Sequence, residues 1–187
     1  FGIKPDSITS YSPYSQWVIT AFMLAFGINF NLFYLILIGR AKSAFKSTEL
    51  WCYISIVAIS IVAIAVNVFS IYGNLADTIR HSSFQVAAII STTGFSTADF
   101  NQWPEFSKTI MLVLMFVGGC AGSTAGGLKV SRIMLMFKTV KRDLRRLVHP
   151  RSVNTVRLEG KSVNNDTISS VGGYIIIYMI IFFAVLL

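Results

Sequence analysis

A short apolar run that ends in a polar turn constrains this chain more than any other feature of its sequence. The run covers residues 84–90 and leads into Ser91, Thr92, Thr93, Gly94 and Phe95, and a polar stretch follows. A helix needs about 20 apolar residues to cross a bilayer, so this run is too short to do so. Irregular backbone at membrane depth is tolerated only where protein buries it or where it lines a water-filled path. The sequence therefore predicts a re-entrant pore loop whose tip faces an ion or solute route.

The glycine at the tip gives this turn a chemistry that suits a cation. Gly94 can adopt backbone angles that other residues resist, so the carbonyl groups of Thr92, Thr93 and Gly94 can point at one axis. A pore helix that begins at about Ser82 would direct its negative C-terminal end at the same place. Rings of carbonyl oxygens can replace the hydration shell of potassium. The turn is therefore a candidate selectivity filter, with an ordinary loop turn as the alternative.

The composition is typical of polytopic membrane proteins. Hydrophobic residues make up 54% of the 187 residues and charged residues 13%, a balance that a soluble domain rarely shows. The net charge of +8 suggests nucleic-acid binding, but ten of the 16 Lys and Arg residues lie between Lys129 and Lys161, after a membrane segment. That distribution is typical of a cytoplasmic loop. We expect contact with membrane lipid and no nucleic-acid partner.

Three further apolar segments predict membrane helices. Residues 17–38 and 50–71 are long enough to span the bilayer, and residues 171–187 begin another span. Asn29 and Asn31 lie inside the first segment. We expect them either to hydrogen-bond a neighbouring helix or to line an ion path.

The charges around the pore loop predict that its tip faces the outside. Residues 77–108 sum to about −1 with His81 neutral, whereas residues 129–166 carry ten positive and three negative charges, and positive loops stay in the cytoplasm. His81 has no second His or Cys nearby in a metal-ligand pattern. It is expected to be a surface or capping residue.

A glycine-rich segment interrupts the apolar stretch at residues 109–137. Five of the ten residues at 118–127 are glycine, and each costs about 1 kcal/mol relative to alanine inside a helix. We expect a helix, a flexible intramembrane loop and a second helix that leads into the cytoplasm. The spacing of Gly122 and Gly127 matches a nucleotide-binding loop, but Leu128 stands where that motif needs lysine.

No catalytic constellation is visible in the sequence. The glycine-rich segment lacks a nucleophile elbow with triad partners, and Cys52 and Cys120 lack the spacing of a zinc site or a disulfide framework. We expect no enzyme and no cofactor in this chain.

A weak internal repeat divides the chain into pore units. A shift of 91 residues aligns three pairs of residues, namely Pro13 with Pro104, Ile19 with Ile110 and Gly27 with Gly118. Neither end looks like a natural terminus, so we expect part of a longer protein. The expected divisions are a return limb and second helix of one unit (1–48), a complete unit (49–148) with its gating loop at 118–127, a cytoplasmic linker (149–170) and the first helix of the next unit (171–187).

Three motifs occur in a fixed order along the chain. The first is Ser91 to Phe95 with Asp99, Trp103 and Pro104, the second is the glycine-rich segment at 118–129, and the third is Leu147, Val148, His149, Pro150 and Arg151. With these motifs the chain resembles the Trk/Ktr/HKT superfamily of potassium transporters, most closely its bacterial TrkH branch.

The resemblance implies an all-α polytopic membrane protein of four helix–pore loop–helix units, as in potassium channels, with a broken second helix in the third unit. It implies potassium uptake across the bacterial inner membrane, with potassium as substrate. It also implies a homodimer and a cytoplasmic nucleotide-binding regulatory subunit of TrkA type. The filter would comprise Ser91, Thr92, Thr93, Gly94 and Phe95, and the gating loop Gly118, Gly119, Gly122, Ser123, Thr124, Gly126, Gly127 and Lys129.

Other membrane functions fit parts of the same pattern. An ion-coupled secondary transporter with a discontinuous helix would also carry a glycine-rich break. A relative that conducts both sodium and potassium, and a scaffold that transports nothing, are further alternatives. Lys129 and Arg132 are expected either to face the cytoplasmic mouth or to snorkel.

Overall fold

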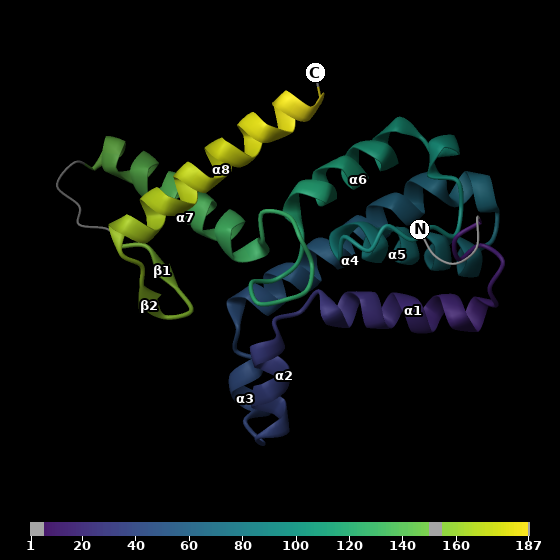
Figure 1. Cartoon of the computed structure of the whole chain (residues 1–187), viewed down its shortest axis with the longest axis horizontal. Coiled ribbons are helices and arrows are strands. Elements are labelled where there is room, and N and C mark those ends of the chain that lie inside the picture. Colours follow the sequence, from purple (N-terminus) through teal and green to yellow (C-terminus); the bar gives the residue numbers. More distant parts are fainter. Residues whose placement is uncertain (1–5, 150–154, 187) are drawn as a thin grey trace. The chain divides into compact units, whose positions relative to one another are not determined.

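The structure is a computed structural model that describes residues 6–149 and 155–186, and these residues are mostly helical (Figure 1). The elements are α1 (Pro13–Phe26), α2 (Phe30–Leu37), α3 (Ala41–Ala44), α4 (Thr48–Tyr72), α5 (Leu75–Ile90), the 3-10 helix η1 (Phe100–Gln102), α6 (Glu105–Val117), α7 (Val130–Val148), β1 (Arg157–Leu158), β2 (Lys161–Ser162) and α8 (Asn165–Leu186). The chain forms two compact units that meet in sequence between Val130 and Ser131. Each unit is described by itself.

Helix α5 is the core of the first unit, because α1, α4 and α6 all contact it (Figure 1). Its C-terminal half is buried from Ser82 to Ile90. Phe84, Ala87 and Ala88 share an apolar cluster with Met23 of α1. A helix of 16 residues is about 24 Å long, so α5 is shorter than a bilayer core.

Helix α5 begins earlier than the expected start near Ser82. Its first residue is Leu75, because the Asn74 side chain accepts a hydrogen bond from the Ala76 N–H and caps the helix. Asp77 in the first turn is favoured by the positive N-terminal end of the helix dipole. The polar composition of this stretch therefore reflects a helix start rather than an irregular loop.

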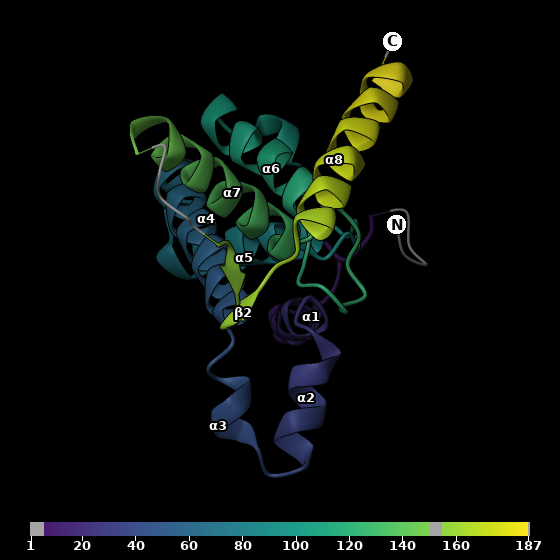
Figure 2. The same ribbon diagram turned by 90° about the vertical axis from the view of Figure 1, so that its left-hand side faces the viewer.

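Residues 17–38, predicted as one membrane helix, form two helices in the structure. The structure divides this segment into α1 and α2, which are bent by 93°, and α2 runs beside α3 (Figure 2). Gly27 ends α1, and the side chain of Asn29 accepts a hydrogen bond from the Asn31 N–H to begin α2. Asn29 is thus a helix cap, which is neither of the two roles that its position in the sequence predicted.

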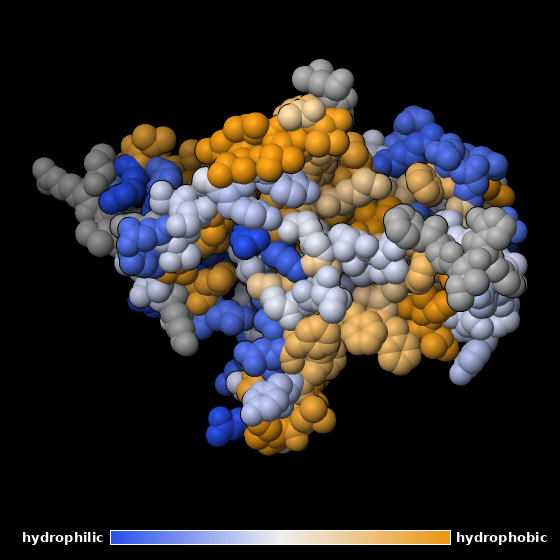
Figure 3. Space-filling model, viewed as in Figure 1, coloured by the Kyte–Doolittle hydropathy of each residue, from blue (hydrophilic) through white to orange (hydrophobic). Residues whose placement is uncertain are grey.

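Among the described residues, α4 and α8 are long and apolar enough to cross a membrane individually. The first agrees with the predicted span at 50–71. The second begins at Asn165 rather than near residue 171, and Asp166 occupies its first turn, where a carboxylate is favourable. Figure 3 shows hydrophobic side chains over α8, and Ile176, Ile180 and Phe183 are exposed there. Lipid can cover such a surface.

The second unit contains the basic helix α7 and a small hairpin. Strands β1 and β2 pair antiparallel, so the predicted linker at 149–170 holds some strand structure and the expectation of an all-α chain is incorrect in this detail. The Lys138 ammonium donates to the Arg157 carbonyl at 2.9 Å. Pro150 and Arg151 of the third motif lie outside the described residues.

Helices α1 and α6 correspond to each other under the shift of 91 residues. Helix α1 starts at Pro13 and ends before Gly27, while α6 follows Pro104 and ends before Gly118. Proline suits a helix start because its missing N–H would have no partner there. The two helices thus start at or after a proline and end before a glycine in the same way, although few of their residues are identical.

Close packing of Gly27 against α4 leaves no room for a larger residue at this position. A Cβ at Gly27 would overlap the hydroxyl of Tyr53, which donates to the Leu24 carbonyl at 3.1 Å. We expect Gly27→Ala to destabilise the full-length protein by about 1–3 kcal/mol through overpacking, measured as a lower thermal unfolding midpoint in detergent. Gly173→Ala is the control, because open space surrounds that position.

The same overlap predicts coupling between the two positions. Tyr53→Phe removes the overlapped hydroxyl, so the double variant should lose less stability than the sum of the two single variants. Additive losses would contradict this packing explanation.

Candidate functional site

The five residues after α5 form a tight turn, which we call the Thr-Thr-Gly turn (residues 91–95). The N–H groups of Thr93 and Gly94 both donate to the Ala88 carbonyl, at 2.9 and 3.3 Å. The hydroxyls of Ser91 and Thr93 are 2.7 Å apart. Gly94 has φ of 75°, in the left-handed region that glycine adopts freely. These bonds fix the turn directly at the C-terminal end of α5.

The carbonyl oxygens of this turn are available to a ligand. Among residues 6–149 and 155–186, no hydrogen-bond donor contacts the main-chain carbonyls of Thr92, Thr93 or Gly94. The helix dipole places partial negative charge at this end of α5. The turn can therefore offer several oxygens to a cation, in the manner of a carbonyl-lined filter.

Phe95 has a different environment from the rest of the turn. Its side chain packs against the apolar cluster that contains Ile8, Met23 and Phe84. The next residue, Ser96, donates its N–H to the Ser7 hydroxyl and accepts from the Ile8 N–H, both at 3.1 Å. Phe95 thus anchors the turn to the core.

The segment between α6 and α7, which we call the Gly-rich loop (residues 118–129), folds back on itself. Leu128 N–H donates to the Phe116 carbonyl and Val130 N–H to the Gly119 carbonyl, both at 3.0 Å. Gly118 has φ of 68°, and a Cβ on it would clash with the Gly126 carbonyl. The two ends of the loop are therefore held together, and glycine is required where they meet.

The Gly-rich loop exchanges main-chain hydrogen bonds with the break between α1 and α2. Cys120 N–H donates to the Gly27 carbonyl at 2.9 Å, and Phe30 N–H donates to the Gly122 carbonyl at 3.1 Å. The Thr124 hydroxyl also donates to the carbonyl of Phe26. The two irregular segments therefore satisfy each other's polar groups.

The remaining predicted loop residues lie within the same fold. The Ser123 hydroxyl donates to the Cys120 carbonyl at 2.6 Å, and Gly127 lies against Gly118. A Cβ on Gly119 would come within 2.8 Å of Ala125, Ser123 and the Gly27 carbonyl.

Two charged side chains hold the loop, and the sequence pointed to only one of them, Lys129, as a member of the predicted gating loop. The Lys129 ammonium donates to the carbonyls of Ser123 and Ala125, so it binds the loop itself. The buried carboxylate of Glu49 accepts a hydrogen bond from the Ala121 N–H at 2.7 Å. An acidic residue directly before an apolar run was the signal that could have identified Glu49.

The Thr-Thr-Gly turn and the Gly-rich loop contact each other. Gly126 N–H donates to the Thr92 hydroxyl at 2.9 Å. Thr92 has φ of 55°, which costs a non-glycine residue about 1–2 kcal/mol. The two predicted motifs, separated in sequence, are thus joined through one threonine side chain.

A hollow of about 470 Å³ lies beside the segment that follows the turn. Asp6 and Asp99 contribute carboxylates to its lining, together with Thr9, Ser10, Ser96, Ala98 and Phe100. Among the described residues, no three His, Cys, Asp or Glu side chains come together as a metal site.

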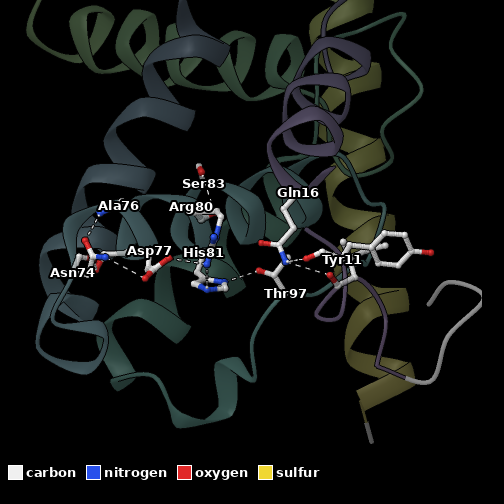
Figure 4. A network of polar contacts seen from close by, with 11 residues as sticks. Tyr11, Gln16, Asn74, Ala76, Asp77, Arg80, His81, Ser83 and Thr97 are labelled. Atoms are coloured by element: carbon white, nitrogen blue, oxygen red, sulfur yellow. Dashed lines mark hydrogen bonds and ion pairs between the residues drawn. The ribbon is translucent and has the colours of Figure 1, made fainter. Parts of the chain in front are cut away.

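A polar network joins the first turns of α5 to the segment after the Thr-Thr-Gly turn (Figure 4). Asp77 pairs with Arg80 at 2.7 Å, and Arg80 lies 3.3 Å from His81 Nε2. Arginine has no acceptor atom, so Nε2 accepts, and Nδ1 carries the proton that is donated to the Thr97 hydroxyl at 2.9 Å. The His81 ring also stacks on Tyr72. His81 is thus partly buried and connects α5 to two other segments.

The surroundings of His81 favour its neutral form. Burial lowers the pKa of His81 below its ordinary value of 6.5, Arg80 lowers it further, and Asp77 acts in the opposite direction. Protonation would remove the acceptor that Arg80 uses and would place two cations side by side. The stabilising contribution is therefore present above about pH 6.5 and is lost as the pH falls through the folded-state pKa.

This network predicts a pH dependence that His81 controls. The thermal unfolding midpoint of the full-length protein should fall between about pH 7.5 and about pH 5, and His81→Gln should reduce that fall because the amide does not titrate. Differential scanning fluorimetry of both proteins across this range measures the difference. The same pH dependence in both proteins would contradict the assignment.

The chain is similar to proteins of known family along its whole length. A family model described as TrkH, cation transport protein, matches residues 1–187. The Trk system potassium uptake protein TrkH of Salmonella typhimurium is 36% identical over 175 residues, which are 91% of this chain and 36% of that protein. The crystal structure of the potassium transporter TrkH from Vibrio parahaemolyticus matches with a TM-score of 0.91 and 30% identity, covering 98% of this chain and 41% of that one. The chain spans less than half the length of these relatives.

Proposed function

This chain belongs to the TrkH family of cation transport proteins, and from that premise we propose that it contributes a selectivity filter strand and a gate to a potassium pathway. The family resemblance inferred from the three motifs is confirmed, and the relatives are potassium uptake proteins rather than enzymes. The protein is a membrane protein with helices that can cross the bilayer. The filter and the gate are our proposals for its own residues.

The filter proposal rests on the main-chain carbonyls just after α5, which no hydrogen-bond donor among the described residues contacts. A potassium ion needs several oxygens at once to replace its water. Thr92, Thr93 and Gly94 offer main-chain oxygens where the α5 dipole is negative. One chain segment supplies only part of a coordination shell, so the remaining oxygens come from equivalent turns elsewhere in the full-length protein.

The gate proposal rests on the contact between the Gly-rich loop and the Thr-Thr-Gly turn. The bond from Gly126 to Thr92 puts the loop directly against the filter strand. Because α7 begins immediately after the loop, movement of that helix would pull on the loop. We propose that a cytoplasmic regulatory subunit of TrkA type moves α7. The full-length protein would act as a homodimer in the bacterial inner membrane.

Ion-coupled transport by a discontinuous helix is the second candidate. The 93° break between α1 and α2 favours it, because broken helices often surround substrate sites in secondary transporters. A strict dependence of potassium flux on a second ion would support this candidate over the gated pathway.

Gly94 provides the direct test of the filter. With φ of 75°, serine at this position is strained and should turn the carbonyls away from the ion. We expect Gly94→Ser to lower rubidium uptake about tenfold, equivalent to a loss of about 1.4 kcal/mol, in a potassium-uptake-deficient strain. Potassium-limited growth should weaken in parallel.

Gly73→Ser is the matched control. Gly73 has φ of 63° and ends α4, with open space around it, so the backbone strain is the same but no filter is involved. Equal losses in the two variants, at equal protein levels in the membrane, would indicate a folding defect and would contradict the filter.

Shortening the Gly-rich loop tests the gate separately. Deletion of residues 122–126 removes the donor to Thr92 and should raise potassium flux in the absence of the regulatory subunit. Flux into vesicles that contain the purified full-length protein measures the effect. Unchanged flux with unchanged regulation would count against a gate at this position.

A further inference from the structure

We propose that Glu49 is a positioning residue that holds the Gly-rich loop in its closed conformation. This inference rests on the proposed role of that loop as a gate. Glu49 lies in the first turn of α4 and the residue is only 7% exposed. Its Oε1 atom accepts a hydrogen bond from the Ala121 N–H at 2.7 Å, across 72 residues of sequence.

The carboxylate of Glu49 reaches beyond the N-terminus of its own helix. The N-terminus of α4 already has a cap, because the Ser47 hydroxyl accepts from the Leu50 N–H at 3.4 Å. Glu49 instead turns its carboxylate toward a main-chain group outside its own helix. The positive N-terminal end of α4 lowers the cost of keeping the buried carboxylate ionised.

The hydrogen bond that the Glu49 carboxylate accepts belongs to the stronger, charge-assisted class. A hydrogen bond to an ionised acceptor is shorter and about twice as strong as a bond between neutral groups. The distance of 2.7 Å is at the short end of the range for N–H to carboxylate oxygen. Displacement of the loop requires this bond to break.

Glu49 and Lys129 bind opposite kinds of main-chain group in the Gly-rich loop. The carboxylate binds a main-chain N–H at Ala121, and the ammonium binds the carbonyls of Ser123 and Ala125. Lys129 belongs to the loop and moves with it. Glu49 belongs to α4, so its bond resists movement of the loop relative to the helix bundle.

Cys120 provides a direct measurement of loop opening. This thiol is free and fully buried next to Ala121, so a reagent can reach it only when the loop moves. The experiment treats the full-length protein in lipid nanodiscs with a small methanethiosulfonate reagent. Peptide mass spectrometry follows the modification of Cys120 separately from Cys52.

The proposal predicts a graded response at Glu49. Modification of Cys120 should be about tenfold faster in Glu49→Ala, which removes the acceptor. It should be about threefold faster in Glu49→Gln, which keeps an acceptor oxygen without the charge. Rubidium flux without the regulatory subunit should rise in the same order.

Glu105→Gln is the matched control, because Glu105 also lies in the first turn of a helix but is exposed and pairs with Lys108. It should leave both readouts at the wild-type values. If Glu49→Ala does not fold, Glu49→Gln decides the result. Equal acceleration in Glu105→Gln and Glu49→Gln would indicate general loosening and would overturn the proposal.

The deletion of residues 122–126 separates failure of the Glu49 proposal from failure of the gate proposal. Wild-type modification and flux in both Glu49 variants, with raised flux in the deletion, would overturn the role of Glu49 and leave the gate intact. Wild-type flux in the deletion as well would mean that the proposed gate itself has failed.

Discussion

The first unit depends on pairing the main-chain N–H and C=O groups that have no hydrogen-bond partner within a helix. Helices α1, α5 and α6 each end at an irregular segment, and unpaired N–H and C=O groups at membrane depth cost several kcal/mol each. The structure pairs these ends with one another. Cys120 bonds to Gly27, Phe30 to Gly122, and Gly126 to Thr92.

Those bonds link the movements of the irregular segments. The Gly-rich loop lies against the Thr-Thr-Gly turn on one side and against the break between α1 and α2 on the other. Movement of the loop must therefore break or exchange bonds at both places. A pathway gated here would couple the state of the loop to the filter strand through Thr92, without a separate transmitting element.

Several charged residues in this unit bind other groups of the protein. Glu49 binds a main-chain N–H and Lys129 binds main-chain carbonyls. Near the other end of α5, Asp77 and Arg80 orient His81 toward Thr97. The Thr-Thr-Gly turn, by contrast, has no charged side chain and presents carbonyl dipoles, which suit a cation that must also leave.

The sequence by itself determined the apolar segments, the short helix before the Thr-Thr-Gly turn and the glycine-rich break, because hydrophobic length and glycine content act locally. It also contained the motifs that identify the family. Only the tertiary structure decided that residues 17–38 bend at Gly27, that Asn29 caps α2, and that Glu49 and Thr92 bind the Gly-rich loop. These features depend on which main-chain groups lack a partner after the helices pack, and partners separated by 34 or 72 residues leave no periodic signal in the chain.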